Sequence, residues 1–144
     1  MIYLDTSALV KLYLLEEGSA WVQQLIASQQ DPLPVWELQE MELLNALRLK
    51  VFRGEITASD AERQVVLFEE RKARGQYYFP ELDRAGFLTT FHRLSAHTPE
   101  LGCRTLDIMH VACALLLAPE CFVSFDGRQC ELAERAGLAV RRMG

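Results

Sequence analysis

Short apolar runs that alternate with helical segments constrain the fold of this chain more than any other feature. Five such runs occur, and they are continuously apolar rather than alternating between apolar and polar residues: Ile2–Leu4, Leu33–Trp36, Tyr77–Phe79, Cys121–Phe125 and Leu138–Val140. Strands buried on both faces have this pattern, which is typical of parallel sheets covered by helices. The sequence therefore predicts an α/β fold, a three-layer α/β/α domain with a short parallel sheet of about five strands.

The segments between these runs have helical periodicity. We expect helices over Thr6–Leu15, Ala20–Ile26, Leu38–Val51, Thr57–Arg74, Asp83–His97, Leu106–Ala118 and Arg128–Ala136. Thr57 or Ser59 and Thr105 are the expected N-caps. The segment after Thr105 is apolar almost all round, so it should be sandwiched between other elements. Pro34 favours the start of a strand or a bulge over a central position.

Length and composition indicate one domain over residues 1–144, since no linker, repeat or low-complexity segment interrupts the chain. No apolar run reaches the roughly 18 residues of a membrane span, and the N-terminus lacks signal-peptide features, so we expect a cytoplasmic protein. None of the four cysteines is spaced as CxxC, which favours reduced structural thiols.

Four acidic residues stand at positions where carboxylates could converge. Asp5 follows the first apolar run and Asp126 the fourth, so both should lie at the carboxyl edge of the sheet if those strands are neighbours. Asp107 lies in the first turn of the helix that precedes the fourth run, and the edge at which that helix begins depends on its direction. Glu42 interrupts an apolar helical stripe.

Each acid taken alone has a simpler interpretation, because an N-cap or first-turn aspartate stabilises a helix by about 0.5–2 kcal/mol and a helical glutamate is usually solvated. The combination indicates more. Carboxylates gathered in a partly buried pocket repel one another and have raised pKa values unless cations compensate them. Ligand sets made only of oxygen select Mg²⁺ or Mn²⁺ rather than zinc.

Four segments together resemble the PIN-domain ribonucleases, specifically the VapC-type toxins of prokaryotic toxin–antitoxin pairs. They are Met1–Tyr13, Glu42–Leu47, Arg104–Leu115 and Phe122–Gln129, the last followed by Leu132–Leu138. They occur in the order of the family's motifs and extend over essentially the whole chain.

The resemblance implies a PIN-like fold and an endoribonuclease that hydrolyses RNA phosphodiesters with a metal-activated water. It assigns Asp5, Glu42, Asp107 and Asp126 as the catalytic residues and as the ligands of Mg²⁺ or Mn²⁺, and it places three hydroxyl groups beside them: Thr6, Ser7 and Ser124. It also implies products with a 5′-phosphate and a 3′-hydroxyl, a homodimer, and a VapB-type antitoxin that blocks the acidic pocket.

Other residues have both a functional and a structural interpretation. His110 could hydrogen-bond the site or simply pack in the core. Four cations, Lys11, Arg48, Lys50 and Arg53, could line an RNA approach or be solvated charges on amphipathic helices. The net charge of −5 argues against binding of nucleic acid mainly through a basic surface, although bound cations would weaken that objection. An apolar set, Leu14, Leu15, Trp21 and Val22, is too large for full burial and indicates a partner surface.

Rival classes fit less well. A receiver domain needs an aspartate after the third strand, where this chain has Tyr77–Pro80, and a haloacid-dehalogenase phosphatase needs DxD where the third position is Ser7. Nucleotide-binding glycine loops are absent. The alternative left open is a catalytically weak PIN-fold module that binds RNA or protein.

Overall fold

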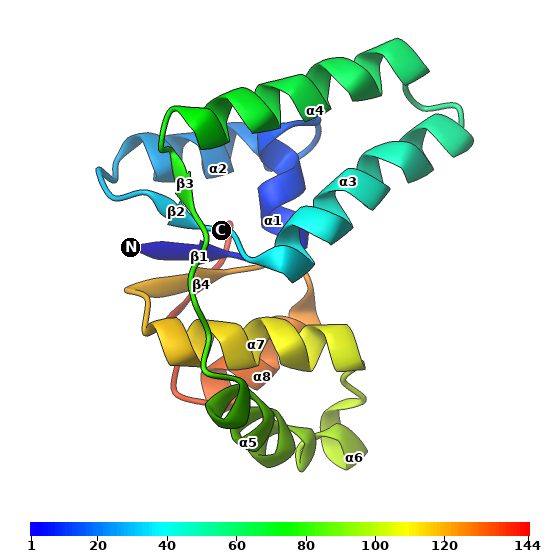
Figure 1. Ribbon diagram of the computed structural model, residues 1–144. Coiled ribbons are helices and arrows are strands. Elements are labelled where there is room, and N and C mark those ends of the chain that lie inside the picture. Colours follow the sequence, from blue (N-terminus) through cyan, green and yellow to red (C-terminus); the bar gives the residue numbers. More distant parts are fainter. The chain divides into compact units, whose positions relative to one another are not determined.

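Strands and helices alternate along the chain as the sequence predicts (Figure 1). The computed structural model describes all residues, 1–144. It divides into two units: unit 1 comprises Met1–Ala8 with Pro80–Gly144, and unit 2 comprises Leu9–Phe79. That both units belong to one domain stays a prediction.

The sheet of unit 1 has the strand order β1-β4-β5 and only parallel pairings. It is made of β1 (Ile2–Leu4), β4 (Cys121–Val123) and β5 (Val140–Arg141). Every residue of β1 and β4 is buried, which confirms that their continuously apolar sequences mark covered parallel strands. Tyr3 pairs with Phe122 across the two strands, and their rings stack with centroids 5.5 Å apart.

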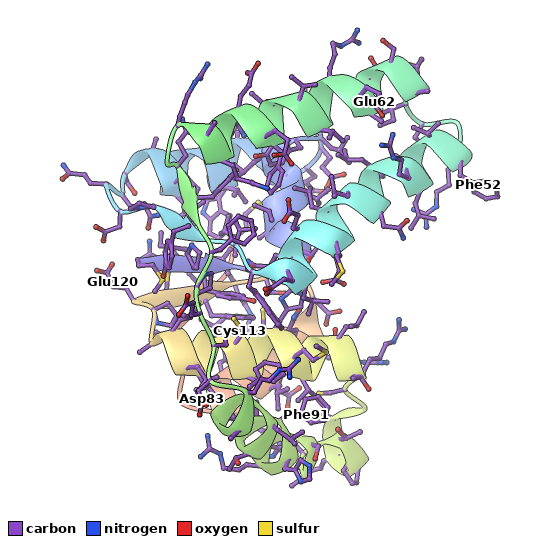
Figure 2. All side chains as sticks on the ribbon, viewed as in Figure 1. Phe52, Glu62, Asp83, Phe91, Cys113 and Glu120 are labelled. Carbon is purple, nitrogen blue, oxygen red and sulfur yellow. The ribbon has the colours of Figure 1, made fainter.

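Helices cover this sheet. Unit 1 contains α5 (Arg84–Ser95), α6 (Thr98–Leu101), α7 (Thr105–Leu117) and α8 (Gly127–Arg135). The apolar helix α7 packs against both α5 and α8, so the prediction that it is sandwiched is confirmed. Cys113 is buried in α7 (Figure 2), and all four cysteines are buried and free. The short α1 (Thr6–Leu9) follows β1 directly.

Unit 2 is built on a helical hairpin, α3 (Glu37–Phe52) and α4 (Ala58–Ala73). It also contains a 3₁₀ turn, η1 (Val10–Leu12), the helix α2 (Ser19–Ala27) and a parallel pair of strands, β2 (Leu33–Pro34) and β3 (Tyr77–Tyr78). An aromatic cluster forms its core: Phe68 contacts both Tyr13 and Tyr77, whose hydroxyls lie 2.5 Å apart. Phe52, at the end of α3, is 87% exposed (Figure 2).

The five predicted strands are all present and their pairings are parallel, but the prediction that they form one sheet of about five strands is wrong: they form a three-stranded and a two-stranded sheet. Proline in β2 gives a physical reason. The amide of Leu33 donates to the carbonyl of Gln76, just before β3, and the amide of Val35 donates to the carbonyl of Tyr78 on β3. The intervening Pro34 would direct its amide to the opposite edge of the strand, and proline has none to donate.

Some boundaries were predicted wrongly. The helix expected over Thr6–Leu15 ends at Leu9 and tightens into η1. The fifth strand begins at Val140, after Gly137 at φ +94°. Thr105 is not the cap of α7; Arg104 is, because the carboxylate of Asp107 accepts the amide of Arg104.

Of the two caps predicted for α4, Thr57 and Ser59, the structure has Thr57, whose Oγ1 accepts the amide of Asp60 at 3.0 Å. Among the helices of the structure, none combines the length and the hydropathy that a membrane crossing requires.

Candidate active site

Asp5 is the buried centre of the site. It directly follows β1 and is only 2% exposed. Its Oδ1 accepts hydrogen bonds from Ser7 Oγ at 2.7 Å and from the amide of Ala8 at 2.9 Å, and its Oδ2 accepts one from Ser124 Oγ at 2.6 Å. Burial raises the pKa of the Asp5 carboxyl, while the charge of His110 and these three donors act to lower it. An ionised Asp5 is thus well hydrogen-bonded but poorly solvated, which is the condition that a nearby cation relieves.

Two serine hydroxyls connect Asp5 to the turn after β4. Ser124 Oγ donates to Asp5 and accepts the amide of Asp126 at 3.0 Å. Ser7 Oγ donates to Asp5 and accepts the amide of Phe125 at 2.9 Å. Because β1 and β4 are parallel neighbours, their carboxyl ends share an edge, and the two hydroxyls fix Asp5 and Asp126 together at that edge.

Asp107 and Asp126 each cap a helix and also line one hollow. Asp126 is the N-cap of α8, where its Oδ1 accepts the amide of Gln129 at 3.1 Å. Asp107 Oδ2 accepts the amide of Arg104 at 3.0 Å in the first turn of α7. Both line an open hollow together with four other residues: Arg104, Phe125, Gly127 and Arg128. Helix α7 therefore begins at the edge where Asp126 lies, which the sequence pattern left undecided.

Glu42 belongs to unit 2. It lies on α3, is partly exposed, and adjoins the stripe formed by Leu43 and Leu47, both fully buried. Its place beside the three aspartates stays a prediction. As the side chains stand in the structure, no three His, Cys, Asp or Glu side chains converge on a single ion position.

The donor chemistry of unit 1 nevertheless fits a hard cation. Asp5, Asp107 and Asp126 offer carboxylate oxygens, and the hydrogen bonds to Asp107 and Asp126 each engage one oxygen, leaving Asp107 Oδ1 and Asp126 Oδ2 for another ligand. Oxygen donors of this kind suit Mg²⁺ or Mn²⁺.

His110 is part of a buried hydrogen-bonded chain. It is 3% exposed, its Nδ1 lies 3.0 Å from Tyr3 Oη, and its Nε2 lies 3.3 Å from Thr6 Oγ1. His110 therefore packs in the core, and it also holds the side chain of Thr6, which follows Asp5. The packing interpretation and the hydrogen-bonding interpretation of His110 are thus both correct.

Three residues of the site were not singled out by the sequence. Arg104 and Arg128 line the hollow of Asp107 and Asp126. Gln129 is 2% exposed, and its buried Nε2 has no hydrogen-bond partner. The available signal was position: each lies within three residues of a candidate aspartate, at the start of the same helix.

Three of the four cations expected to line an RNA approach are in ion pairs. The ion-pair distances are 3.0 Å from Lys11 Nζ to Glu16 Oε1, 2.7 Å from Arg48 Nη1 to Glu62 Oε1, and 2.6 Å from Lys50 Nζ to Glu55 Oε2. The fourth, Arg53, is exposed just beyond the end of α3. Much of this positive charge is thus compensated within unit 2.

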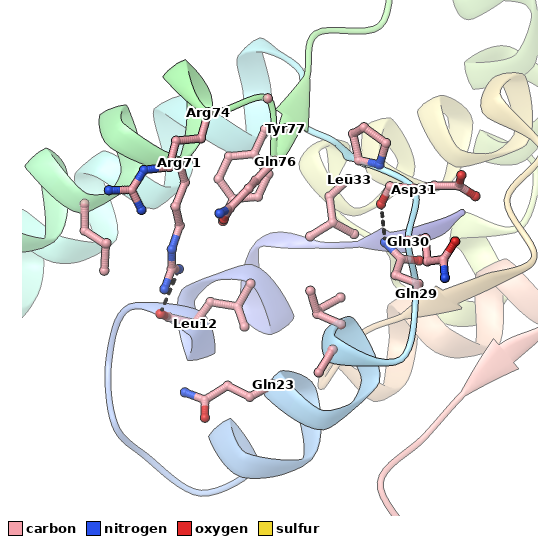
Figure 3. A pocket seen from close by; sticks show the side chains of 15 residues that line it. Leu12, Gln23, Gln29, Gln30, Asp31, Leu33, Arg71, Arg74, Gln76 and Tyr77 are labelled. Carbon is pink, nitrogen blue, oxygen red and sulfur yellow. Dashed lines mark hydrogen bonds between the residues drawn. The ribbon is translucent and has the colours of Figure 1, made fainter.

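Unit 2 has a second hollow of different chemistry (Figure 3). Arg71 in its wall donates to the carbonyl of Leu12 at 3.4 Å and lies over the Tyr13 ring, 4.9 Å from its centroid. The other polar lining residues are mostly amides and a second arginine: Gln23, Gln29, Gln30, Gln76 and Arg74, with Asp31 the one acid. A lone carboxylate is a poor metal site, so the candidate active site is the hollow of unit 1.

Comparisons with known proteins concern the family and the fold of the chain. The model of the PIN domain family matches residues 2–135. No curated protein sequence matches the chain. Among solved structures, the chain is similar to VapC20 of Mycobacterium tuberculosis, described as a sarcin-ricin loop cleaving toxin, with a TM-score of 0.65 and 15% identity over 96% of this chain and 97% of that chain. At this identity the likeness concerns the fold, and it confirms the predicted PIN-like α/β class.

Proposed function

The chain belongs to the PIN-domain family, and from that premise we propose that it is a metal-dependent endoribonuclease, the toxin of a VapBC-type toxin–antitoxin pair. The observation that carries the proposal is the edge where β1 and β4 end. Buried Asp5 is joined there through Ser124 to Asp126, and Asp126 shares a hollow with Asp107. Carboxylates of this kind at the carboxyl ends of parallel strands suit metal-assisted hydrolysis.

We assign Asp5, Glu42, Asp107 and Asp126 to the catalytic and metal-binding set, with Mg²⁺ or Mn²⁺ as the ion. When bound, such an ion lowers the pKa of water and offsets negative charge that develops on a phosphodiester. Donors hold both oxygens of the Asp5 carboxylate before substrate arrives. Little reorganisation of this group is then needed during the reaction, which favours catalysis.

The other side chains of the site hold the Asp5 carboxylate and its neighbours in position. Ser7 and Ser124 keep the Asp5 carboxylate in place, and the buried pair of Tyr3 and His110 holds Thr6 next to it. The chemistry needs no protein nucleophile, and the proposed products carry a 5′-phosphate and a 3′-hydroxyl.

The proposed partners are an RNA substrate, a VapB-type antitoxin and a second copy of the chain. Support for a protein partner comes from the start of unit 2, where Leu15 is 95% exposed and Leu14 and Trp21 are partly exposed, while Val22 is buried. Leu14 and Leu15 are adjacent in the chain, and contiguous exposed apolar side chains, rather than a single one, are typical of a contact surface. RNA as substrate is consistent with the expected cytoplasmic location.

Cleavage of RNA by the purified chain, with and without Mn²⁺ or Mg²⁺, tests the proposal. A sarcin-ricin loop RNA is a suitable first substrate, because the structural neighbour is described as cleaving that loop. We expect metal-dependent cleavage that is abolished in Asp5→Asn and Asp126→Asn. Asp83→Asn is the matched control, since Asp83 caps α5 as Asp126 caps α8 but lies outside the hollow.

Equal cleavage by the parent and by Asp5→Asn would indicate a contaminating nuclease and refute the assignment. Metal-independent RNA binding without cleavage would favour the catalytically weak binding module instead.

A further inference from the structure

A nuclease with a net charge of −5 must present positive charge locally to hold a polyanion. Much of the chain's positive charge is already compensated: Lys72 pairs with Glu40, Arg135 with Glu100, and Arg142 with Glu134. Cations that form no ion pair and stand beside the aspartates are therefore the best candidates for contacts with a substrate.

Arg104 and Arg128 meet both conditions. Both are exposed and both line the hollow of Asp107 and Asp126. Neither forms an ion pair; the one side-chain hydrogen bond is a long contact of 3.5 Å from Arg128 Nη1 to the carbonyl of Gly102. The backbone of Arg104 is fixed by its bond to Asp107, and Arg128 lies in the first turn of α8. The two guanidinium groups thus extend from anchored points on the same rim.

The rim between them is open. A Cβ built on Gly127 would meet no atom within 4 Å, so nothing occupies the space beside the backbone that joins Asp126 to Arg128. Within unit 1, the backbone beside Asp126 is therefore not covered at this point.

We propose that Arg104 and Arg128 bind phosphates of the RNA strand next to the bond that is cut, an inference that rests on the proposed function. The planar guanidinium group matches phosphate oxygens in a two-point hydrogen bond and remains charged at any physiological pH. Contacts of this kind position the strand and carry no sequence information. They compensate the repulsion between the phosphates and the carboxylates on the same rim.

The experiment measures binding of a labelled single-stranded RNA by fluorescence anisotropy over a range of salt, in the Asp5→Asn background so that the RNA stays intact. Arg104→Gln and Arg128→Gln should each weaken binding about tenfold at low salt, and each should reduce the salt slope by about 0.7. The lysine variants of both residues should keep most of the slope, because the charge is retained. In the cleaving parent, the glutamine variants should raise KM more than they lower kcat.

Two controls make the same charge change elsewhere. Arg93→Gln alters an exposed arginine on α5, and Arg74→Gln alters the exposed one of the two arginines that line the second hollow (Figure 3). Neither should change the salt slope. Circular dichroism of each variant shows whether it is folded.

The outcomes separate this inference from the proposed function. If the chain cleaves RNA but the two glutamine variants bind and cleave as the parent does, the phosphate contacts are refuted and the nuclease stands. If Arg74→Gln alone weakens binding, the strand lies on the second hollow and the inference is wrong. If the variants lose RNA affinity in a chain that never cleaves, the contacts stand and the nuclease is refuted. If the chain binds an acidic peptide through these two arginines and binds no RNA, both the phosphate contacts and the proposed nuclease function are refuted.

Discussion

Replacing Ser124 by alanine tests the reasoning about the buried carboxylate most directly. Its hydroxyl makes two hydrogen bonds: it donates to Asp5 Oδ2 at 2.6 Å and accepts the amide of Asp126 at 3.0 Å. Alanine fits the same space without either bond, so the change leaves Asp5 with two donors, the Ser7 hydroxyl and the Ala8 amide.

The expected loss follows from these two bonds. A hydrogen bond to a charged group contributes about 1.5–3 kcal/mol, and a neutral one about 0.5–1.5 kcal/mol. Because Asp126 is exposed, water can replace the bond to its amide, so most of the loss comes from Asp5. We expect Ser124→Ala to lower the free energy of unfolding by about 2–3 kcal/mol at neutral pH.

The loss should depend on pH, and the sign follows from Asp5. Burial raises its pKa above the ordinary value of 3.8, and the Ser124 hydroxyl opposes that rise. The hydroxyl stabilises the ionised carboxylate. Its contribution to the free energy of unfolding is therefore largest above the folded-state pKa of Asp5 and shrinks as pH falls through that pKa. Urea unfolding at several pH values measures this, with Ser95→Ala as the matched control, because the Ser95 hydroxyl donates only to the carbonyl of His92. A destabilisation that is the same at every pH would refute the account.

Three further results are expected. Asp5→Asn should raise the stability of the metal-free protein at neutral pH, because an acid whose folded-state pKa is raised costs stability once pH exceeds its unfolded value of 3.8; thermal unfolding at pH 4 and pH 8 checks that the gain is larger at the higher pH. Tyr3→Phe should destabilise the protein by about 1–3 kcal/mol, since it leaves Nδ1 of buried His110 without this partner; a loss near zero in urea unfolding would contradict the buried chain. Thr57→Ala should cost about 1 kcal/mol through the lost cap of α4, with no change in RNA cleavage, as calorimetry and the cleavage assay would show.

Local patterns were sufficient for much of the fold. The run Ile2–Leu4 is apolar without interruption and is followed at once by Asp5, and the strand has the predicted bounds. The order of strands and helices was likewise predicted, because hydrophobic periodicity and turn residues are properties of neighbouring positions. Helix α6 was not predicted, since four residues around Pro99 are too few to show a helical period.

Features that depend on partners distant in sequence could not be predicted. The edge at which α7 begins is set by its packing against α5 and α8, so the pattern around Asp107 did not determine it. The cap of α7 was missed for a different reason. Threonine is the better cap by preference, but Asp107 bonds the amide of Arg104 from within the first turn and so sets the helix start one residue earlier.

The two interpretations of Asp126, helix cap and metal ligand, describe different oxygens of one side chain and do not compete. Its Oδ1 accepts the amide of Gln129, whereas its Oδ2 accepts no hydrogen bond. Asp126 also lines the hollow, where Oδ2 can serve as a metal ligand. Asparagine caps a helix about as well as aspartate does. Asp126→Asn therefore preserves the cap while removing the charge, and a loss of cleavage in that variant reports on the carboxylate itself rather than on the start of α8.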